Sequence, residues 1–296
     1  MFRGSPALPI FILLRYILYM VLLDGKKLAQ KIAEGLKKEV AGFSRRPRLG
    51  IVVVGKNPVI QKFIEQKKKF GKEVGVDVRI YPLEESVTTN ELRKKVAELV
   101  HEKRNSGIII QLPLPERINA QYILNSVTPD KDIDVLSSRS IGNFAVGRNP
   151  AMPPVAGAVK ALLDEYGIDY KNKYIVVVGA GGLVGKPIAV WLLNEKATFS
   201  VVRSSTKNPQ EFLKHADIII SGIGKPNYIT GYMVKDGVVA VDAGTSESEG
   251  KVVGDIDFES VSQKASFITP VPGGVGPVTV AMLFKNLLVL VKEQKQ

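Results

Sequence analysis

The strongest constraint on the fold of this chain is the alternation of short β-branched runs with longer amphipathic stretches. Residues 49–54 and 107–111 are apolar runs of strand length, and a helical pattern lies between them from Pro58 toward Val74. Strands that alternate with helices form right-handed βαβ units around a parallel sheet. The chain is therefore predicted to be an α/β protein. Further strands are predicted at residues 76–81, 174–178, 198–202, 218–221 and 238–241.

Apolar spacing and capping residues predict where the helices begin. Leu28, Ile32, Leu36 and Val40 recur every four residues behind Asp24, which is a predicted N-cap. Thr89 is the predicted N-cap of the third helix along the chain. Further helices are predicted at residues 158–166, 188–194 and 277–293. The last of these is apolar nearly all round, so it must be buried, and we expect it to pack back onto the N-terminal lobe.

A change in composition divides the chain. Residues 129–154 are rich in turn formers and predict a domain boundary within an irregular loop. We expect one lobe to contain residues 21–149 together with 273–296, and a second lobe to contain residues 150–272. Residues 1–20 form an extension of doubtful status. The segment 1–19 holds Arg3 and Arg15 but no acids, and an incorrectly assigned start codon before Met20 or Val21 is favoured over a membrane anchor.

Composition narrows the classes of function. The chain has no cysteine and only His101 and His215 as imidazoles, which excludes a thiolate site and argues against a multi-histidine metal site. The absence of cysteine fits an intracellular protein. The net charge of +12 is compatible with nucleic-acid binding, with attraction of small anions, or with a lysine-rich solvated surface. Because the lysines are scattered among glutamates, the surface interpretation is favoured and no nucleic-acid partner is expected.

A glycine-rich turn follows the predicted strand 174–178. Gly179, Gly181 and Gly185 lie at a strand-to-helix junction, in a loop one residue longer than the strict dinucleotide fingerprint. Gly179 permits a tight turn, Gly181 or Gly182 lets backbone N–H groups approach a pyrophosphate, and Gly185 lets the helix and strand pack closely. An ordinary glycine-rich connection is the alternative, but the flanking elements favour a dinucleotide site.

The end of the second strand of this unit selects the cofactor. An NAD site usually places an acid there, which binds the ribose 2′-hydroxyl. The chain instead reads Arg203-Ser204-Ser205-Thr206-Lys207, which offers cations and hydroxyls to a 2′-phosphate. NADP is therefore the predicted cofactor, and a solvent-exposed basic loop is the alternative.

Three polar residues in the N-terminal half are candidates for a site. Gln111 follows the strand GIII at its carboxyl end, where open α/β sheets bind ligands. Asp134 lies in a loop, where catalytic groups concentrate, although a simple turn aspartate is equally compatible with the sequence. Lys67 shares a helical face with Phe63, but on the sequence alone it is one lysine among many.

Taken in order, the motifs resemble those of the methylenetetrahydrofolate dehydrogenase/cyclohydrolase family. They are VGKNP followed by Lys67, GIIIQLPLP, PDKDID, GAGGLVGKP, RSSTKN, ADIIISGIGKP, VDAGT, KVVGDIDF and ITPVPGGVGPVTVAML. The resemblance covers about residues 23–291, and QLPLP and TPVPGGVGP are its most specific parts. It implies an N-terminal αβα lobe, a Rossmann-type doubly wound parallel sheet that binds NADP, and a folate cleft between the two lobes.

The resemblance also implies roles for individual residues. Lys67 is the acid/base or polarising group of ring opening, Gln111 orients it, and Asp134 binds the pterin. The substrate, a tetrahydrofolate derivative, is expected to lie against Phe63 and the loop residues Pro272, Gly273 and Gly274. The expected cofactor contacts are Gly179, Ala180, Gly181, Gly182, Leu183, Val184, Arg203, Ser204, Thr206 and Thr245. No metal is expected.

The family assignment carries expectations about the setting of the enzyme. It implies a homodimer that acts in one-carbon metabolism and purine biosynthesis, in the cytoplasm and without a membrane partner. Four positions depart from the family pattern: Phe63 replaces tyrosine, Val135 replaces glycine, Arg203 replaces histidine, and Pro154-Val155-Ala156-Gly157 replaces Thr-Pro-x-Gly. These departures bear on the efficiency of the cyclohydrolase and on the folate contacts.

Three other functions remain as alternatives. The chain could be a monofunctional methylenetetrahydrofolate dehydrogenase in which Phe63 has weakened ring opening. It could be another two-domain NADP dehydrogenase that resembles shikimate dehydrogenase, although such an enzyme would not require QLPLP or PVPGGVGP. A non-catalytic protein that binds anions or nucleic acid predicts salt-sensitive binding and no folate turnover.

Overall fold

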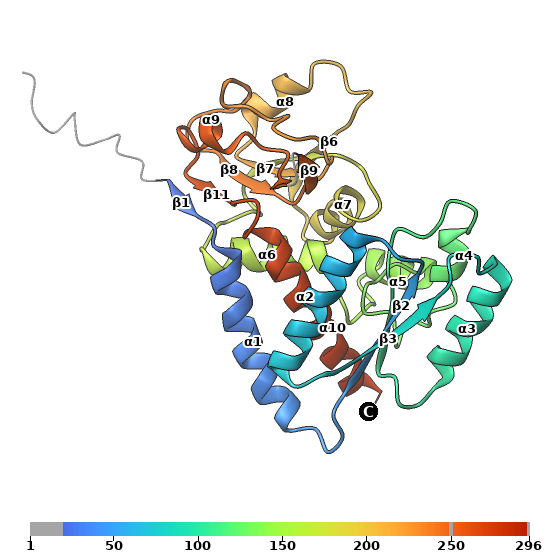
Figure 1. The fold of residues 1–296 in the computed structure, drawn as a ribbon. Coiled ribbons are helices and arrows are strands. Elements are labelled where there is room, and N and C mark those ends of the chain that lie inside the picture. The colour runs from blue at the N-terminus through green and yellow to red at the C-terminus, as the bar shows by residue number, and fades with distance from the viewer. Residues whose placement is uncertain (1–19, 249–250, 295–296) are drawn as a thin grey trace, which may run out of the picture.

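The computed structural model describes residues 20–248 and 251–294 and contains two parallel β-sheets, each flanked by helices (Figure 1). The prediction about residues 1–19 lies outside this part of the chain. The helices are α1 (Gly25–Ala41), α2 (Pro58–Val74), α3 (Thr89–His101), α4 (Ala120–Leu124), α5 (Ser138–Ala145), α6 (Pro154–Glu165), α7 (Gly185–Asn194), α8 (Pro209–His215), α9 (Phe258–Ser262) and α10 (Val275–Glu293). The predicted α/β class is confirmed.

The N-terminal lobe is built on a three-stranded parallel sheet in the order β3-β2-β4. Its strands are β2 (Arg48–Val54), β3 (Asp77–Leu83) and β4 (Gly107–Ile110). The central strand β2 is buried along almost its whole length, as expected for a parallel strand that helices cover on both faces. The edge strand β3 is only half-buried. Helices α2 and α3 make the two crossovers, which place the loops that follow β2 and β4 at one edge of the sheet.

The C-terminal lobe holds a six-stranded parallel sheet in the order β1-β11-β8-β7-β5-β6. Its strands are β1 (Val21–Leu22), β5 (Tyr174–Val178), β6 (Thr198–Val202), β7 (Ile218–Ser221), β8 (Val239–Asp242) and β11 (Phe267–Ile268). From β5 the chain crosses through α7 to β6 on one side, and from β6 it returns through α8 to β7 on the other side of β5, which is the doubly wound arrangement that the family resemblance implies. The carboxyl end of β5 is therefore the topological switch point.

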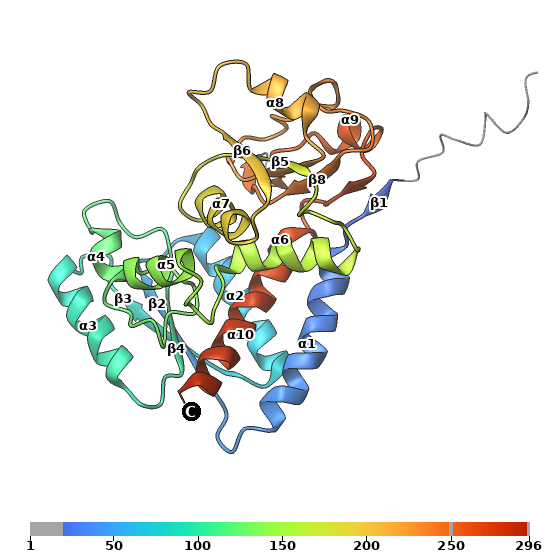
Figure 2. The same ribbon diagram turned by 180° about the vertical axis from the view of Figure 1, so that it is seen from behind.

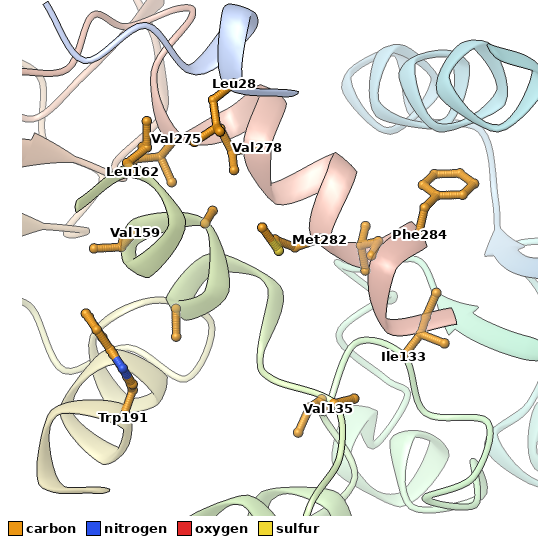
Figure 3. Close-up of a cluster of buried hydrophobic side chains, with 14 of the residues drawn as sticks. Leu28, Ile133, Val135, Val159, Leu162, Trp191, Val275, Val278, Met282 and Phe284 are labelled. Carbon is orange, nitrogen blue, oxygen red and sulfur yellow. The ribbon is translucent and has the colours of Figure 1, made fainter. Parts of the chain in front are cut away.

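Helix α10 lies at the centre of the molecule. It packs against α1, α2 and α6, and Figure 3 shows its side chains Val275, Val278, Met282 and Phe284 among apolar residues from both lobes. Among the described residues, α10 is the helix long and apolar enough to cross a membrane by composition alone, but most of that stretch is buried inside the protein. The prediction that it packs back on the N-terminal lobe is confirmed.

Helix α6 connects the two lobes, lying across the molecule between the two sheets (Figure 2). It contacts α10 on one side and α7 on the other. Strand β1 makes a second connection, because Val21 and Leu22 pair with Phe267 and Ile268 of the larger sheet before the chain enters α1. The first described residues are thus shared between the lobes.

Several predicted boundaries were wrong, for local reasons. The N-cap of α3 is Thr88, whose side chain and that of Glu91 form a reciprocal capping box, and Thr89 is already helical. Residues 129–154 are not all loop, because α5 forms within them behind the N-cap Ser137. Helix α6 begins at Pro154 rather than at residue 158, because proline is well suited to the first helical turn. Asp24 is confirmed as the N-cap of α1.

The remaining strands form a small antiparallel hairpin. Its strands are β9 (Ser246–Ser248) and β10 (Lys251–Val253). Ser246 lies opposite Val253, and Ser248 lies opposite Lys251. The hairpin follows directly after Thr245, one of the predicted cofactor contacts. It therefore extends from the carboxyl edge of the larger sheet.

Candidate active site between two sheet edges

The buried pair of Lys67 and Gln111 is the centre of the candidate catalytic site. Lys67 projects from the third turn of α2, and Gln111 is the first residue after β4. The Lys67 Nζ donates a hydrogen bond of 2.7 Å to Gln111 Oε1, and Gln111 Nε2 donates one of 2.8 Å to the Leu112 carbonyl. Because that carbonyl can only accept, the amide must present its oxygen to the lysine. Both side chains are less than 10% exposed.

Burial changes the chemistry of this lysine. Removal from water lowers the pKa of the Lys67 ammonium, and the nearby Asp134 carboxylate partly opposes that shift. A lower pKa makes the ammonium a stronger acid and leaves more of the amine unprotonated at a given pH than in a solvated lysine. The sequence offered no sign of this, because Lys67 follows an ordinary amphipathic pattern in which most lysines face solvent.

Asp134 is brought to the same edge by a strand-like segment that the sequence did not predict. Ile108 of β4 forms a parallel bridge with Asp132, and the Ile108 N–H donates to the Lys131 carbonyl at 2.9 Å. The chain therefore runs beside β4, and Asp134 arrives two residues later at the level of the strand's end. Burial raises the pKa of Asp134 to about 6, the charge of Lys67 lowers it, and Asp132 raises it further.

The residue after Asp134 has an unusual backbone. Val135 has φ of 56°, in the left-handed region that β-branched residues rarely adopt, and its side chain is fully buried in the apolar cluster that Figure 3 shows. The valine that departs from the family pattern therefore occupies a conformation that favours glycine. The buried side chain packs in the main apolar cluster, so burial of this valine accompanies the unfavourable backbone conformation.

A buried amide in α10 also holds this loop, and the sequence analysis missed it. Asn286 Nδ2 donates to the carbonyls of Ile133 and Met152, at 2.8 and 2.7 Å, and Asn286 Oδ1 accepts from the Met152 N–H at 3.4 Å. The signal was present, because a lone amide in an otherwise apolar, buried helix must find hydrogen-bond partners. Asn286 thereby joins the segment before Asp134 to the segment before α6.

The glycine turn lies at the switch point of the larger sheet. Gly179 has φ of 107°, and its N–H donates to the carbonyl of Val202 at the end of β6. A Cβ on Gly185 would lie 2.0 Å from the Gly179 carbonyl oxygen, so only glycine allows α7 to start this close to the turn. In contrast, a Cβ on Gly181 or Gly182 would meet open space. An open backbone before the N-terminus of a helix fits a pyrophosphate.

The predicted 2′-phosphate loop is next to this turn. Arg203 and Ser204 are exposed, and Thr206 is half-buried. The Arg203 N–H donates to Thr206 Oγ1 and the Thr206 N–H to the Arg203 carbonyl, so the backbone forms a closed turn. Arg203 Nε donates to Ser205 Oγ at 3.1 Å, which holds the guanidinium at the surface. The residues present therefore fit a phosphorylated nucleotide.

The other predicted site residues lie in loops at the carboxyl edge of the larger sheet or are exposed on α2. Pro272, Gly273 and Gly274 follow β11, and Thr245 follows β8 and is exposed. Phe63 is 44% exposed although Lys67, one helical turn later, is buried. An exposed aromatic ring one turn from a buried amine suits stacking with a flat substrate. No group of acids and histidines that could hold a metal occurs among the residues described.

Two buried aspartates at the carboxyl edge of the larger sheet were also missed. Asp242, at the end of β8, accepts from the N–H groups of Gly244 and Ile256, at 2.9 and 2.8 Å. Asp255 accepts from the Ser221 hydroxyl and from the N–H groups of Ile223 and Lys225. Burial raises the pKa of Asp242 to about 6, and the nearby Asp255 adds to that shift. The two carboxylates fix the loops that follow β7 and β8.

Two family models together match most of the chain. The model of the tetrahydrofolate dehydrogenase/cyclohydrolase catalytic domain matches residues 23–134, and that of the NAD(P)-binding domain matches residues 153–295. The bifunctional protein FolD of Nitratiruptor sp. is 42% identical over 281 residues, which cover 94% of this chain and 100% of that protein.

Solved structures of the same family are similar to this chain over nearly its whole length. The bifunctional FolD methylenetetrahydrofolate dehydrogenase/cyclohydrolase of Campylobacter jejuni has a TM-score of 0.90 and 41% identity, covering 93% of this chain and 99% of that one. The corresponding Trypanosoma brucei enzyme, complexed with NADP and an inhibitor, has a TM-score of 0.89 and 34% identity, covering 94% and 99%. A shikimate dehydrogenase shares only the fold, at 12% identity and a TM-score of 0.50.

Proposed function

The chain belongs to the tetrahydrofolate dehydrogenase/cyclohydrolase family, and on that basis we propose how its own residues divide the two reactions. It is an NADP-dependent enzyme that oxidises 5,10-methylenetetrahydrofolate to 5,10-methenyltetrahydrofolate and hydrolyses that product to 10-formyltetrahydrofolate. The observation that carries the assignment of residues is the 2.7 Å hydrogen bond between the buried Lys67 amine and Gln111.

The oxidation step requires alignment more than acid–base chemistry. A hydrogen leaves the methylene carbon with both its electrons, and the bound NADP supplies the acceptor carbon. The protein's part is to hold the folate carbon in line with that acceptor. Phe63 and the backbone of Pro272, Gly273 and Gly274 are the proposed folate contacts. Asp134, as a carboxylate, accepts hydrogen bonds from the pterin amino and ring N–H groups.

The hydrolysis step requires a proton to move. Water attacks the methenyl carbon and loses a proton as the new C–O bond forms. The bond from that carbon to N5 then breaks as N5 gains a proton, and the hydroxyl loses its remaining proton to solvent as the formyl C=O forms, so one proton is released overall. A lysine with a lowered pKa can take the first proton and deliver the second. Gln111 keeps the Lys67 amine directed at the edge of the sheet. A direct test is to supply methylenetetrahydrofolate with NADP: methenyl product should form and then disappear, whereas permanent accumulation would identify a monofunctional dehydrogenase.

We propose that the glycine turn and the Arg203 loop together bind the cofactor. Gly179 to Val184 surround the pyrophosphate, Thr245 lies along the same edge, and Arg203, Ser204 and Thr206 contact the 2′-phosphate. The closed turn at Arg203 and the open backbone at Gly181 and Gly182 support this placement.

Replacing Arg203 by alanine is expected to raise the KM for NADP about tenfold and to leave the KM for NAD nearly unchanged. One exposed charge-assisted contact to the phosphate is lost, which corresponds to roughly 1.4 kcal/mol. Steady-state kinetics with both cofactors measures this. Lys214→Ala removes an equal charge from the exposed end of α8 and serves as the control. An equal loss with NAD and NADP would contradict the role of Arg203.

We propose that the enzyme is a homodimer that pairs through the edge strand β6. β6 ends the larger sheet, Val201 on it is 37% exposed, and Leu193 at the end of α7 is 64% exposed. An exposed apolar edge strand is an aggregation hazard unless something covers it, and a second copy related by twofold symmetry would extend the sheet.

The substitution Val201→Lys is therefore expected to convert a species of twice the chain mass into one of a single chain mass. Light scattering during size-exclusion chromatography measures the mass. Tyr232→Lys, at an exposed tyrosine in the short turn 231–233, should leave the mass unchanged. A wild-type protein that elutes as a single chain would contradict the dimer.

We propose that this chemistry takes place in the cytoplasm, where the formyl product contributes to purine biosynthesis, without a nucleic-acid or membrane partner. Several surface lysines are paired with acids, as in Lys31–Glu165 and Lys95–Glu98, which supports a solvated surface. The burial of α10 supports its role as a core helix. We also propose the division into residues 21–149 with 273–296 and residues 150–272, with β1 as a shared strand.

A further inference from the structure

The segment that enters α1 runs beside the loop that the proposed function places in the cleft. The Val21 N–H donates to the Ser266 carbonyl at 2.9 Å, and the Leu23 N–H to the Ile268 carbonyl at 2.8 Å. The strand β11 contacted in this way continues directly into residues 269–274. The start of α1 and the Pro272–Gly274 loop therefore leave the same edge of the larger sheet side by side.

Gly25 is the point of closest approach between them. A Cβ at this position would lie 1.7 Å from the Gly274 carbonyl oxygen and 2.9 Å from the Gly273 carbonyl oxygen. The next residue, Lys26, donates its N–H to the Gly273 carbonyl at 3.1 Å. The loop backbone thus rests on the first turn of the helix, and only glycine leaves room for it.

The first turn of α1 is anchored, so it can act as a fixed surface. Asp24 Oδ1 caps the helix by accepting from the Lys27 N–H at 3.0 Å. The Asp24 N–H donates to the Tyr166 hydroxyl at 2.8 Å. The Tyr166 ring lies edge-on to Phe267 of β11, with the ring centroids 6.4 Å apart. Contacts with α6 and β11 therefore hold the helix start, while Pro272 in the loop is exposed.

We propose that Gly25 is a positioning residue for hydride transfer, because it sets the place of the Gly273–Gly274 backbone. The inference rests on the proposed position of this loop beside folate and nicotinamide. A side chain at residue 25 must displace the loop by more than about 1 Å, and a misplacement of that size costs roughly a hundredfold in rate when two reacting groups must be aligned. Ring opening depends on Lys67 and Gln111, which lie on other elements.

The test compares two glycine-to-alanine substitutions in the same helix. Gly25→Ala is expected to lower kcat for methylenetetrahydrofolate oxidation roughly a hundredfold, and to lower hydrolysis of supplied methenyltetrahydrofolate by less than about tenfold. Gly35→Ala is the control, because a Cβ there meets nothing within 4 Å. It should leave both rates unchanged and stabilise the helix by about 1 kcal/mol.

The ratio of the two rates decides the outcome. An unchanged ratio in Gly25→Ala, whether both rates fall together or neither falls, would overturn the inference. If Gly25→Ala does not fold, Tyr166→Phe decides instead, because it removes only the hydroxyl that anchors Asp24 and should lower the ratio several-fold. An unchanged ratio in Tyr166→Phe would also overturn the inference. Failure of the proposed function would look different, since the wild-type protein itself would then lack one or both reactions.

Discussion

Replacing Lys67 by methionine is expected to lower cyclohydrolase activity by 10²- to 10⁴-fold and to reduce hydride transfer by less than about tenfold. This range is what a positioned acid–base group typically contributes to a rate. Methionine is unbranched and apolar, so it fills the buried space beside Gln111 without adding a buried polar group, while Asp134 loses the nearby positive charge. The fold should therefore survive the substitution.

Separate assays measure the two reactions. Disappearance of supplied methenyltetrahydrofolate reports hydrolysis, and reduction of NADP reports hydride transfer. Lys67→Arg separates charge from proton transfer, because a guanidinium keeps the positive charge but does not give up its proton near neutral pH. It should be as inactive in hydrolysis as methionine.

Lys69→Met controls for the loss of a lysine, since Lys69 lies two residues along α2 and is exposed. It should retain both activities. A Lys67→Met protein that loses both reactions in equal proportion would remove the role assigned to Lys67, and one that keeps full hydrolysis would do the same.

The architecture could be predicted from the sequence because its signals are local and repeated. Every residue of the run Leu49–Val54 except Gly50 has an apolar side chain, which is typical of a strand covered on both faces. Strand β2 is that strand. The all-round apolar pattern near the C-terminus required burial, and α10 is buried. Boundaries were less certain because several residues can cap. Here the sequence did hold the deciding signal, since Glu91 stands three residues after Thr88 and forms the reciprocal capping bond with it, whereas Leu92 stands three after Thr89.

The site could be predicted only in part. Gln111 was found because it is a polar residue at the carboxyl end of a strand. The same argument applied to Asp242 at the end of β8 would have indicated the buried carboxylates that hold the loops after β7 and β8. Lys67 could not be separated from its neighbours by pattern, since its burial depends on where β4 and the Asp134 segment lie. The resemblance to the family singled it out.

Contacts between distant segments carry no local signal. Gly25 looks like an ordinary residue at a helix start, and its closeness to Gly274 arises because β1 and β11 pair in parallel at the edge of the larger sheet. Val135 is a similar case. A valine in a loop gives no indication of φ near 56°, and only comparison with a pattern that has glycine there suggests it. The roles assigned to these residues stay predictions until the variants are measured.

The pH dependence of the dehydrogenase is expected to follow the ionisation of Asp134. Burial raises the pKa of this carboxyl to about 6, and the proposed pterin contact requires the carboxylate. The kcat/KM for methylenetetrahydrofolate should therefore fall about tenfold for each pH unit below about 6. In Asp134→Asn this acid limb should disappear, and kcat/KM should be roughly a hundredfold lower, because two charge-assisted hydrogen bonds are lost and the new amide can oppose the pterin donors.

The Asp134→Asn variant should be more stable than the wild-type protein, although it is less active. The pKa of Asp134 is higher in the folded protein than its ordinary value of 3.8. Its contribution to the free energy of unfolding is therefore largest below pH 3.8 and is lost as the pH rises through about 6. Asp134→Asn avoids burying a charge, so it should raise the free energy of unfolding by up to about 3 kcal/mol at pH 8 and by little at pH 4. Denaturant unfolding at the two pH values measures the difference.

Activity and stability together separate Asp134 from a residue that is only structural. Asp130→Asn, in the same loop and exposed, should change neither the pH profile nor the unfolding free energy. If Asp134 served only to hold the loop, its asparagine variant would lose stability at pH 8 and would keep the acid limb of the wild-type profile. A variant that is more stable, much less active and no longer sensitive to acid is the result that a partly buried, pterin-binding carboxylate requires.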